Sequence, residues 1–364
     1  MGIRIRTVVV LLALLVLHGL KLPPASGVLS AATPHGKPGA GIGSLSVLPS
    51  LGGNSEAVAV NAAGTTIVGS SYDHHGLQHA VKWTLKQGAW TLTDLPWPPG
   101  VASVTARGVN NHGDVAGNTN TIPSVNSRAI LWPITGNVSV LGCSTDVGPT
   151  SVYGISANGQ TVVGNASGGA ALWQPGKCLV SLPTLIPSQY SSAGAVNGDG
   201  TIIGGSVSTD PTAGVPVRWT LVAGQWQVEQ LDALTGTVWS GAANAAGDLA
   251  GYVYVSCALA DGCQRAAIWY AAGGSQVLGT LGGDTSSATG INATGEVVGI
   301  STPTRASQSE TGFFWSESTG MVPLAFTGKW AAAWALSDVR PDGTRLVVGT
   351  DARVRAVVWV IANP

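Results

Sequence analysis

The chain has 364 residues, and its 17 basic and 18 acidic residues leave a net charge of −1 at pH 7. This balance gives no electrostatic basis for binding nucleic acid. Only 10% of the residues are charged while 51 are glycine, a composition that disfavours a helical domain and suits strands buried on both faces.

Residues 1–27 have the pattern of a secretory signal peptide, with Arg4 and Arg6 before the apolar stretch from Val8 to Leu17. That stretch is shorter than the roughly 20 residues that a helix needs to span a bilayer. We therefore expect a secreted or periplasmic protein with no membrane attachment after cleavage; a retained anchor is the alternative. Cleavage would leave 14 basic and 18 acidic residues, a net charge of −4.

Residues 28–44 are rich in Gly, Ala and Pro, which indicates a linker. From residue 45 to residue 364 one phrase recurs: Asn, two residues, Gly, a β-branched run, Gly, a variable stretch, and a small apolar run ending in Trp. Its seven copies close at Trp83, Trp132, Trp173, Trp219, Trp269, Trp315 and Trp359, a period of about 46 residues. A strand-rich repeat of this length is typical of a propeller or a solenoid.

The first copy divides into four strands: 57–60, 65–68, 80–84 and 90–95. Tight turns follow the first and third strands, and a long loop follows the second, so each unit is one antiparallel sheet. We therefore predict an all-β, seven-bladed propeller with four-stranded antiparallel blades.

Two further positions repeat. We expect a glycine to close every second strand, namely Gly69, Gly117, Gly164, Gly204, Gly251, Gly299 and Gly349. We expect a tiny side chain two residues before each turn, because inner strands crowd at the axis. With the seventh turn placed at Arg340–Gly343, Asp338 breaks that rule, and we expect it to face the channel.

The seventh unit has almost no chain left for a fourth strand after Trp359. The segment 47–53 resembles 277–283, which carries the fourth strand of the fifth unit. We therefore expect residues 45–49 to supply the outer strand of the last blade, which would leave no exposed edge at the seam.

Four cysteines in an exported chain are candidates for disulfides. We expect Cys257 and Cys263 to pair within one loop. Cys143 and Cys178 fall near opposite ends of adjacent outer strands, about 20 Å apart, whereas a disulfide needs Cα atoms within about 7 Å. Their pairing stays open and requires the loop after Cys143 to fold back.

The long connections of all units lie on one face, where sequence variation is concentrated and binding sites are expected. Trp97, Trp239, Trp330 and Trp334 fall in or beside the connections between units. Such rings could stack on sugars or anchor a protein partner; packing between blades is the alternative.

His79, Arg128, Arg265 and Arg355 each stand four residues before their repeat Trp, which predicts a partial basic ring on the rim of the same face. This ring could hold an anionic ligand, or its members could bond neighbouring loops. Asp73, His74, His75 and His79 form the only histidine cluster, but adjacent side chains on an extended segment point apart, so we expect no metal site. We expect no cofactor.

The units resemble the bacterial extracellular HAF repeats, named for a His-Ala-Phe triplet before the Trp. The sixth unit matches most fully, through 281–283, 290–292, 295–299 and 313–315, and His79-Ala80-Val81 occupies the triplet position in the first. Arg replaces His in three units, and the third and fourth depart further. The resemblance implies export and a propeller-like fold, and it implies no activity or catalytic residues.

No recognised enzymatic motif occurs in the chain. We expect a monomeric binding module that recognises a glycan or a cell-surface partner through its variable face, rather than an enzyme. The alternative is a lyase or hydrolase of an extracellular polymer, which predicts carboxylates and His converging on that face. A purely structural repeat protein would instead bury all four of the Trp rings outside the repeat position.

Overall fold

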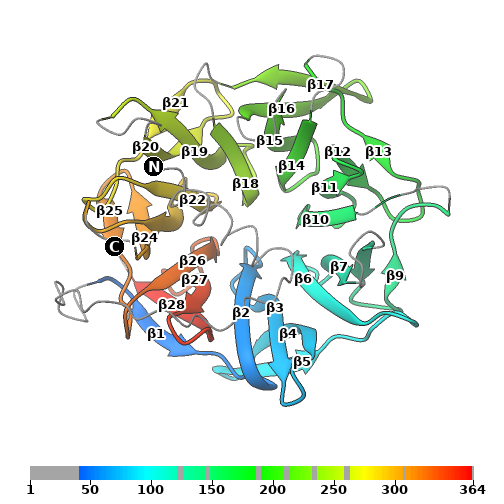
Figure 1. Ribbon diagram of the computed structural model, residues 1–364, viewed down its shortest axis with the longest axis horizontal. Helices are drawn as coiled ribbons and strands as arrows, with labels where there is room; N and C mark the ends of the chain where they lie inside the picture. Colours follow the sequence, from blue (N-terminus) through cyan, green and yellow to red (C-terminus); the bar gives the residue numbers. More distant parts are fainter. Residues whose placement is uncertain are drawn as a thin grey trace, which may run out of the picture. The chain divides into compact units, whose positions relative to one another are not determined.

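Seven antiparallel blades of four strands surround a central axis (Figure 1). The computed structural model describes residues 41–120, 127–144, 148, 150–185, 190–208, 214–231, 236–257, 263–305 and 309–362, without the side chains of 120 and 236–241; all belong to one unit, Pro38–Pro364. Five blades are separate sheets, while blades six and seven join through one parallel bridge, Thr311 to Ala331. The predicted seven-bladed, all-β architecture is confirmed.

Each blade has an inner, a second, a third and an outer strand. The inner strands are β2 (Gly52–Val60), β6 (Ser103–Val109), β10 (Thr150–Ile155), β14 (Tyr190–Val196), β18 (Gly236–Ala243), β22 (Ser286–Ile291) and β26 (Ala331–Leu336). The second strands are β3 (Thr66–Asp73), β7 (Val115–Asn120), β11 (Val162–Ala166), β15 (Ile202–Ser208), β19 (Leu249–Val255), β23 (Val297–Ser301) and β27 (Thr344–Asp351).

The two remaining positions complete the blades. The third strands are β4 (Gln78–Lys86), β8 (Ala129–Trp132), β12 (Gly169–Trp173), β16 (Val215–Val222), β20 (Cys263–Trp269), β24 (Thr311–Ser316) and β28 (Ala356–Ala362). The outer strands are β5 (Ala89–Asp94), β9 (Ser139–Val140), β13 (Val180–Ser181), β17 (Gln225–Gln230), β21 (Ser275–Val277), β25 (Gly320–Pro323) and β1 (Ser44–Val47). The strands of the first blade run further toward its long loop than predicted, so that loop shrinks to residues 74–77.

The N-terminal strand closes the ring, as predicted. β1 pairs with β28 in antiparallel register, with Leu45 opposite Trp359. Ile42 also bridges Leu324 at the end of blade six. Residues 42–44 therefore belong to the propeller and not to the expected linker.

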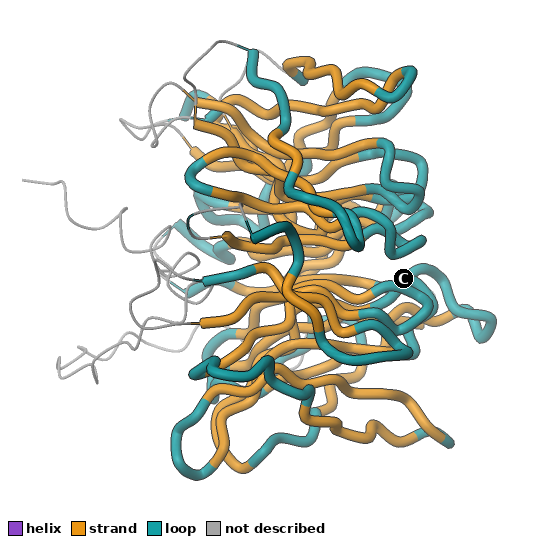
Figure 2. Tube along the Cα trace, turned by 90° about the vertical axis from the view of Figure 1, so that its right-hand side faces the viewer, coloured by secondary structure: helices purple, strands orange, loops and turns teal. Residues whose placement is uncertain are grey.

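Side view and chain order together define two faces of the ring (Figure 2). The turn face carries the connections from inner to second and from third to outer strand. The loop face carries the connections from second to third strand and from one blade to the next. None of the described segments forms a helix that is long and apolar enough to cross a membrane.

Every inner strand with a described register has a β-bulge near its middle. In blade one, Ala57 pairs with Gly69 and Ala59 with Val68, which leaves Val58 as an extra residue. The bulge brings the inner backbone so close that a Cβ on Gly69 would fall on the carbonyl oxygen of Glu56. The same contact recurs at Gly117, Gly164, Gly205, Gly299 and Gly349. Glycine is required here by space, because its lack of a side chain permits the approach.

This register corrects two sequence assignments. In blade four the closing glycine is Gly205, which pairs with Ala193, and not Gly204. In blade seven the turn begins at Ser337, whose backbone N–H donates to the Leu346 carbonyl, three residues earlier than predicted. Ala335 then occupies the small position beside the bulge, so the rule holds and Asp338 is no exception.

The repeated Asn is a buried structural residue. Asn61 is 2% exposed, and its side-chain oxygen accepts the backbone N–H groups of Thr65 and Thr66, which fixes the turn. Asn110, Asn197, Asn244 and Asn292 make equivalent bonds. In blades three and seven the hydroxyls of Ser156 and Ser337 accept instead.

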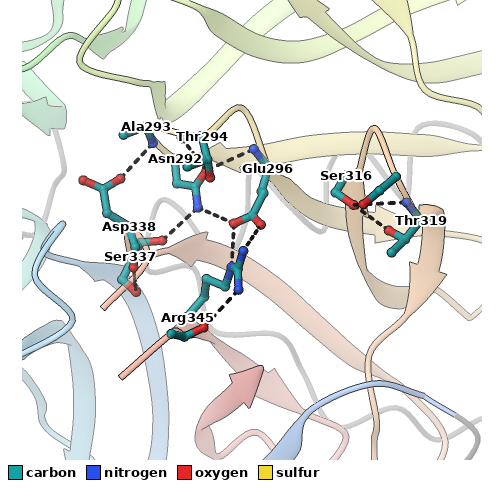
Figure 3. A network of polar contacts seen from close by, with 11 residues as sticks. Asn292, Ala293, Thr294, Glu296, Ser316, Thr319, Ser337, Asp338 and Arg345 are labelled. Carbon is teal, nitrogen blue, oxygen red and sulfur yellow. Dashed lines mark hydrogen bonds and ion pairs between the residues drawn. The ribbon is translucent and has the colours of Figure 1, made fainter. Parts of the chain in front are cut away.

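Hydrogen bonds also join neighbouring turns around the turn face. Between blades six and seven, Asn292 donates to the Ser337 carbonyl, and the Asp338 carboxylate accepts the N–H of Ala293 (Figure 3). The N–H of Asp338 donates to the Ala62 carbonyl of blade one. A bidentate ion pair of Arg345 with the buried Glu296 reinforces the same junction.

The repeat Trp residues lie in the core, at 0–7% exposure, and link consecutive blades. Trp83, Trp132 and Trp219 donate Nε1–H to the carbonyls of Pro49, Pro96 and Pro183, each at 2.7 Å. Each of those prolines directly follows the leucine that marks the outer strand of the preceding blade. The N–H of that leucine, in turn, donates to the third strand of its own blade. Leu-Pro therefore fastens one blade to the next.

Both disulfides form, with Cα separations of 4.7 Å for Cys143–Cys178 and 5.7 Å for Cys257–Cys263. The pairing that the sequence left open is therefore present. The estimate of the strand span was too long, because β9 and β13 have only two residues each. The chain after Leu141 folds back to the turn of blade three and ties the two blades together.

We predict that Gly164→Ala destabilises the protein by about 3 kcal/mol, because the new Cβ would overlap the Ser151 carbonyl oxygen. Gly168→Ala is the matched control from the same blade. Its φ of +87° is strained for alanine, but nothing lies within 4 Å, so about 1 kcal/mol is expected. Urea unfolding measures both, and equal losses would contradict the packing argument.

We predict that Cys143→Ser with Cys178→Ser lowers the free energy of unfolding by about 3 to 4 kcal/mol, because the bond closes a loop of 35 residues. The disulfide between Cys257 and Cys263 closes a much shorter loop, so Cys257→Ser with Cys263→Ser should lower the free energy of unfolding by about 2 kcal/mol. Chemical denaturation with and without a reductant measures both. A loss that survives full reduction of the parent would show that the substitutions act through packing instead.

Candidate functional site

The predicted His79 and Trp97 come together on the loop face of blade one. Their ring centroids are 4.9 Å apart and the rings are tilted by 57°. His79 lies on β4, while Trp97 lies in the connection to blade two and packs on the core between blades one and two. Trp97 remains half-buried, so part of its ring is accessible.

Two carboxylates flank the His79 ring. Nδ1 lies 2.9 Å from Asp94 Oδ2, and Nε2 lies 3.7 Å from Asp73 Oδ2. Asp73 accepts the backbone N–H groups of Leu77 and His75, which hold the pKa of its carboxyl below the ordinary value. We call His79, Trp97, Asp73 and Asp94 the rim patch; it combines an aromatic ring with carboxylates on one face.

The other predicted Trp residues lie apart from this patch. Trp330 is half-buried in the connection from blade six to blade seven. Trp334 lies within β26, not in a connection, and its Nε1–H donates to Thr350 in the same blade. Trp239 lies within β18, also an inner strand, and its side chain is outside the described part. Both were expected in or beside connections; the inner strands begin earlier than the repeat suggested.

The predicted basic positions do not share a partner, since each is engaged near its own blade. Arg355 pairs with the buried Asp351, and Arg265 donates to the Asp284 carbonyl. Burial alone would raise the pKa of Asp351, but hydrogen bonds from Arg355 hold it below the ordinary value. Arg128 is half-buried, and its backbone N–H donates to Thr119. Among the described residues, no group of three His, Cys, Asp or Glu side chains could hold a metal ion.

A second group of polar residues, which the sequence analysis missed, lies on the inner strands. Glu56 on β2, Arg107 on β6 and Tyr153 on β10 come from three consecutive blades and are all half-buried. Burial raises the pKa of Glu56 to about 7, and the Arg107 charge opposes that rise. Tyr72 on β3 also feels the charge of Glu56. We call Glu56, Arg107 and Tyr153 the axial trio.

A comparison of equivalent positions could have found Arg107 and Tyr153 of the axial trio. Arg107 and Tyr153 are the extra residues of their bulges, as Val58 is in blade one, and each is followed by a glycine. The corresponding residues elsewhere are Gly194, Thr289 and Trp334. An arginine and a tyrosine at a position that is otherwise uncharged could therefore have been recognised in an alignment of the repeats.

Comparison of the sequence with models of known protein families and with curated proteins finds no match. Among solved structures, the chain is similar to the Cps50 (Swd1) β-propeller domain of Myceliophteria thermophila, with TM-score 0.55 and 13% identity, covering 86% of this chain and 99% of that one. The β-propeller domain of the Trilobed protease from Pyrococcus furiosus gives TM-score 0.52 and 10% identity over 84% and 93%.

A catalytically inactive virginiamycin B lyase from Staphylococcus aureus with quinupristin gives TM-score 0.50 and 9% identity over 87% and 99% of the two chains. At such identities these likenesses establish the propeller fold and nothing about the ligand.

The raised pKa of Glu56 predicts that stability falls as pH rises from about 4.5 to about 7, since the folded state binds the proton more tightly there. Glu310 has the same raised pKa, also through burial, and contributes in the same window. We expect Glu56→Gln to reduce the fall between pH 5 and pH 8 by about 1 to 2 kcal/mol.

Denaturant unfolding at several pH values measures this effect. Glu310→Gln is the matched control and should remove a separate part of the fall. If Glu56→Gln leaves the slope of the parent unchanged, Glu56 is ionised at neutral pH and the argument from burial is wrong.

Proposed function

We propose that the protein is an exported propeller that binds a glycan of a cell surface through the rim patch. The observation that carries the proposal is the contact of the Trp97 ring with His79, which two carboxylates flank. An aromatic face can stack on a sugar ring, and carboxylate oxygens accept hydrogen bonds from its hydroxyls. The side chain of Asp94 is 45% exposed and can reach such a ligand.

Export is supported by the disulfides, which persist in oxidising compartments, and by the leader-like first residues. The proposed relation to the HAF repeats points the same way. Trp330, also half-buried on the loop face, offers a further stacking surface near the junction of blades six and seven.

A polysaccharide-degrading enzyme is the second candidate, because a His and two carboxylates do converge on this face. The low exposure of the His79 imidazole favours binding over catalysis. The His79 side chain is 16% exposed, and its buried Nε2 makes no hydrogen bond. A general base has to reach the proton that it abstracts, whereas the His79 ring is enclosed by Asp73, Asp94 and Trp97.

We expect Trp97→Ala to weaken binding to the array glycans that the parent protein recognises by about 5- to 150-fold, because the lost stacking surface contributes on the order of 1 to 3 kcal/mol. Asp94→Asn should weaken binding less, since an amide still accepts a hydrogen bond.

Trp90→Ala is the matched control: Trp90 is the second residue of β5, beside the turn face of the same blade, and it packs on the core. Equal loss in Trp97→Ala and Trp90→Ala would indicate damage to blade one rather than a binding site. Release of new sugar ends from the bound glycan would favour the enzyme, and recognition of no glycan would end the proposal.

A further inference from the structure

The edge of each inner strand faces the axis of the ring (Figure 1). The extra residue of each bulge lies on this inner strand, beside the axis, and it has no partner in the second strand. In blade six this residue is Thr289, whose hydroxyl donates to the Ala333 carbonyl of the next inner strand. The uncharged hydroxyl of Thr289 thus joins blade six to blade seven through a backbone carbonyl.

Blades two and three differ, because their extra residues are Arg107 and Tyr153. On β2 of blade one, Glu56 pairs with Ser70 and stands two residues before the extra residue Val58. Arg107 lies on β6, the inner strand between β2 with Glu56 and β10 with Tyr153, and it interacts electrostatically with both residues. The Tyr153 phenol also hydrogen-bonds with Ser151 of its own strand. All three side chains keep part of their surface accessible, so they are neither sealed in the core nor free in bulk solvent.

A structural role explains this arrangement poorly. Burying an ion pair removes two charges from water, and the pair rarely stabilises a protein more than apolar residues of the same volume would. In the remaining bulges with described side chains the extra residues are uncharged, namely Val58, Gly194, Thr289 and Trp334. Clusters of titratable groups with perturbed proton affinity occur most often where a ligand binds or reacts.

We propose that the axial trio is a binding site for a small organic carboxylate. The guanidinium of Arg107 presents paired N–H donors that match the two oxygens of a carboxylate. The Tyr153 hydroxyl can donate a further hydrogen bond. This site shares no residue with the rim patch, so it stands whether or not the rim patch binds glycans.

Glu56 makes this binding dependent on pH. When protonated, its carboxyl donates a hydrogen bond to the ligand; when ionised, it competes with the ligand for Arg107 and repels it. Arg107 and Tyr72 are the titratable groups that act on Glu56. On the neighbouring β27, Arg345 pairs with Glu296 and Asp351 with Arg355, so these charges are compensated elsewhere. Since the pKa of Glu56 is about 7, binding should strengthen as pH falls below 7.

Titration calorimetry of the whole protein with D-glucuronate, and with D-glucose as the matched neutral sugar, tests the proposal. The two ligands share a ring and differ in the carboxylate, which stays ionised throughout. We expect glucuronate to bind about tenfold more tightly at pH 5.5 than at pH 8.0, at constant ionic strength, and glucose not to bind at the axis. Arg107→Gln should weaken glucuronate binding at least tenfold.

Two variants separate a lost site from a lost fold. Glu56→Gln keeps a neutral donor and should bind glucuronate at both pH values with little difference between them. Arg353→Gln removes an exposed arginine of blade seven and should bind as the parent does. Equal binding of glucose and glucuronate, unchanged binding in Arg107→Gln, or no saturable binding of glucuronate by the folded parent would each overturn the proposal.

Discussion

The bulge of the inner strand is the constraint on which the propeller depends. It adds one residue to the strand nearest the axis and presses the backbone of that strand against the second strand. Only glycine fits at the contact, which is why Gly69 and its counterparts recur in the repeat. Because the strand bends there, the small residues beside the bulge approach the axis together, and the extra residue is left at the edge. The bulge therefore determines both the packing of the blades and which side chains lie beside the axis.

Most of the fold could be predicted from the repeat, since its fixed residues each serve one backbone contact. The Asn accepts turn N–H groups, Trp83 and three of its counterparts donate to the preceding blade, and the N-terminal segment completes the last sheet. The errors arose where a unit departs from the common length. Blade seven has a longer turn after Ser337, and counting back from its glycine misplaced Asp338. The pairing of Cys143 with Cys178 depended on strand lengths that the pattern did not specify.

The candidate sites were predicted less completely. His79 and Trp97 were both selected from their place on the loop face, yet their contact depends on how one connection folds against β4. Trp334 was selected as a loop residue and is held by Thr350 inside a strand. Arg107 and Tyr153 were overlooked because each strand was read alone, and a bulge cannot be recognised in one strand whose side chains simply alternate. A residue that looks buried on one face is turned toward the axis when its strand contains one residue too many.

The pairing of β1 with β28 joins residues more than 300 positions apart, so the seventh blade can form only when both ends of the chain are present. Contacts of such separation carry a large entropic cost and form late in folding. During synthesis from the N-terminus, β1 therefore has no partner until the last residues of the chain have been added. During that interval the exposed edges of the half-built ring are open to other strands. The short, two-residue outer strands of blades two and three give such contacts little length on which to form.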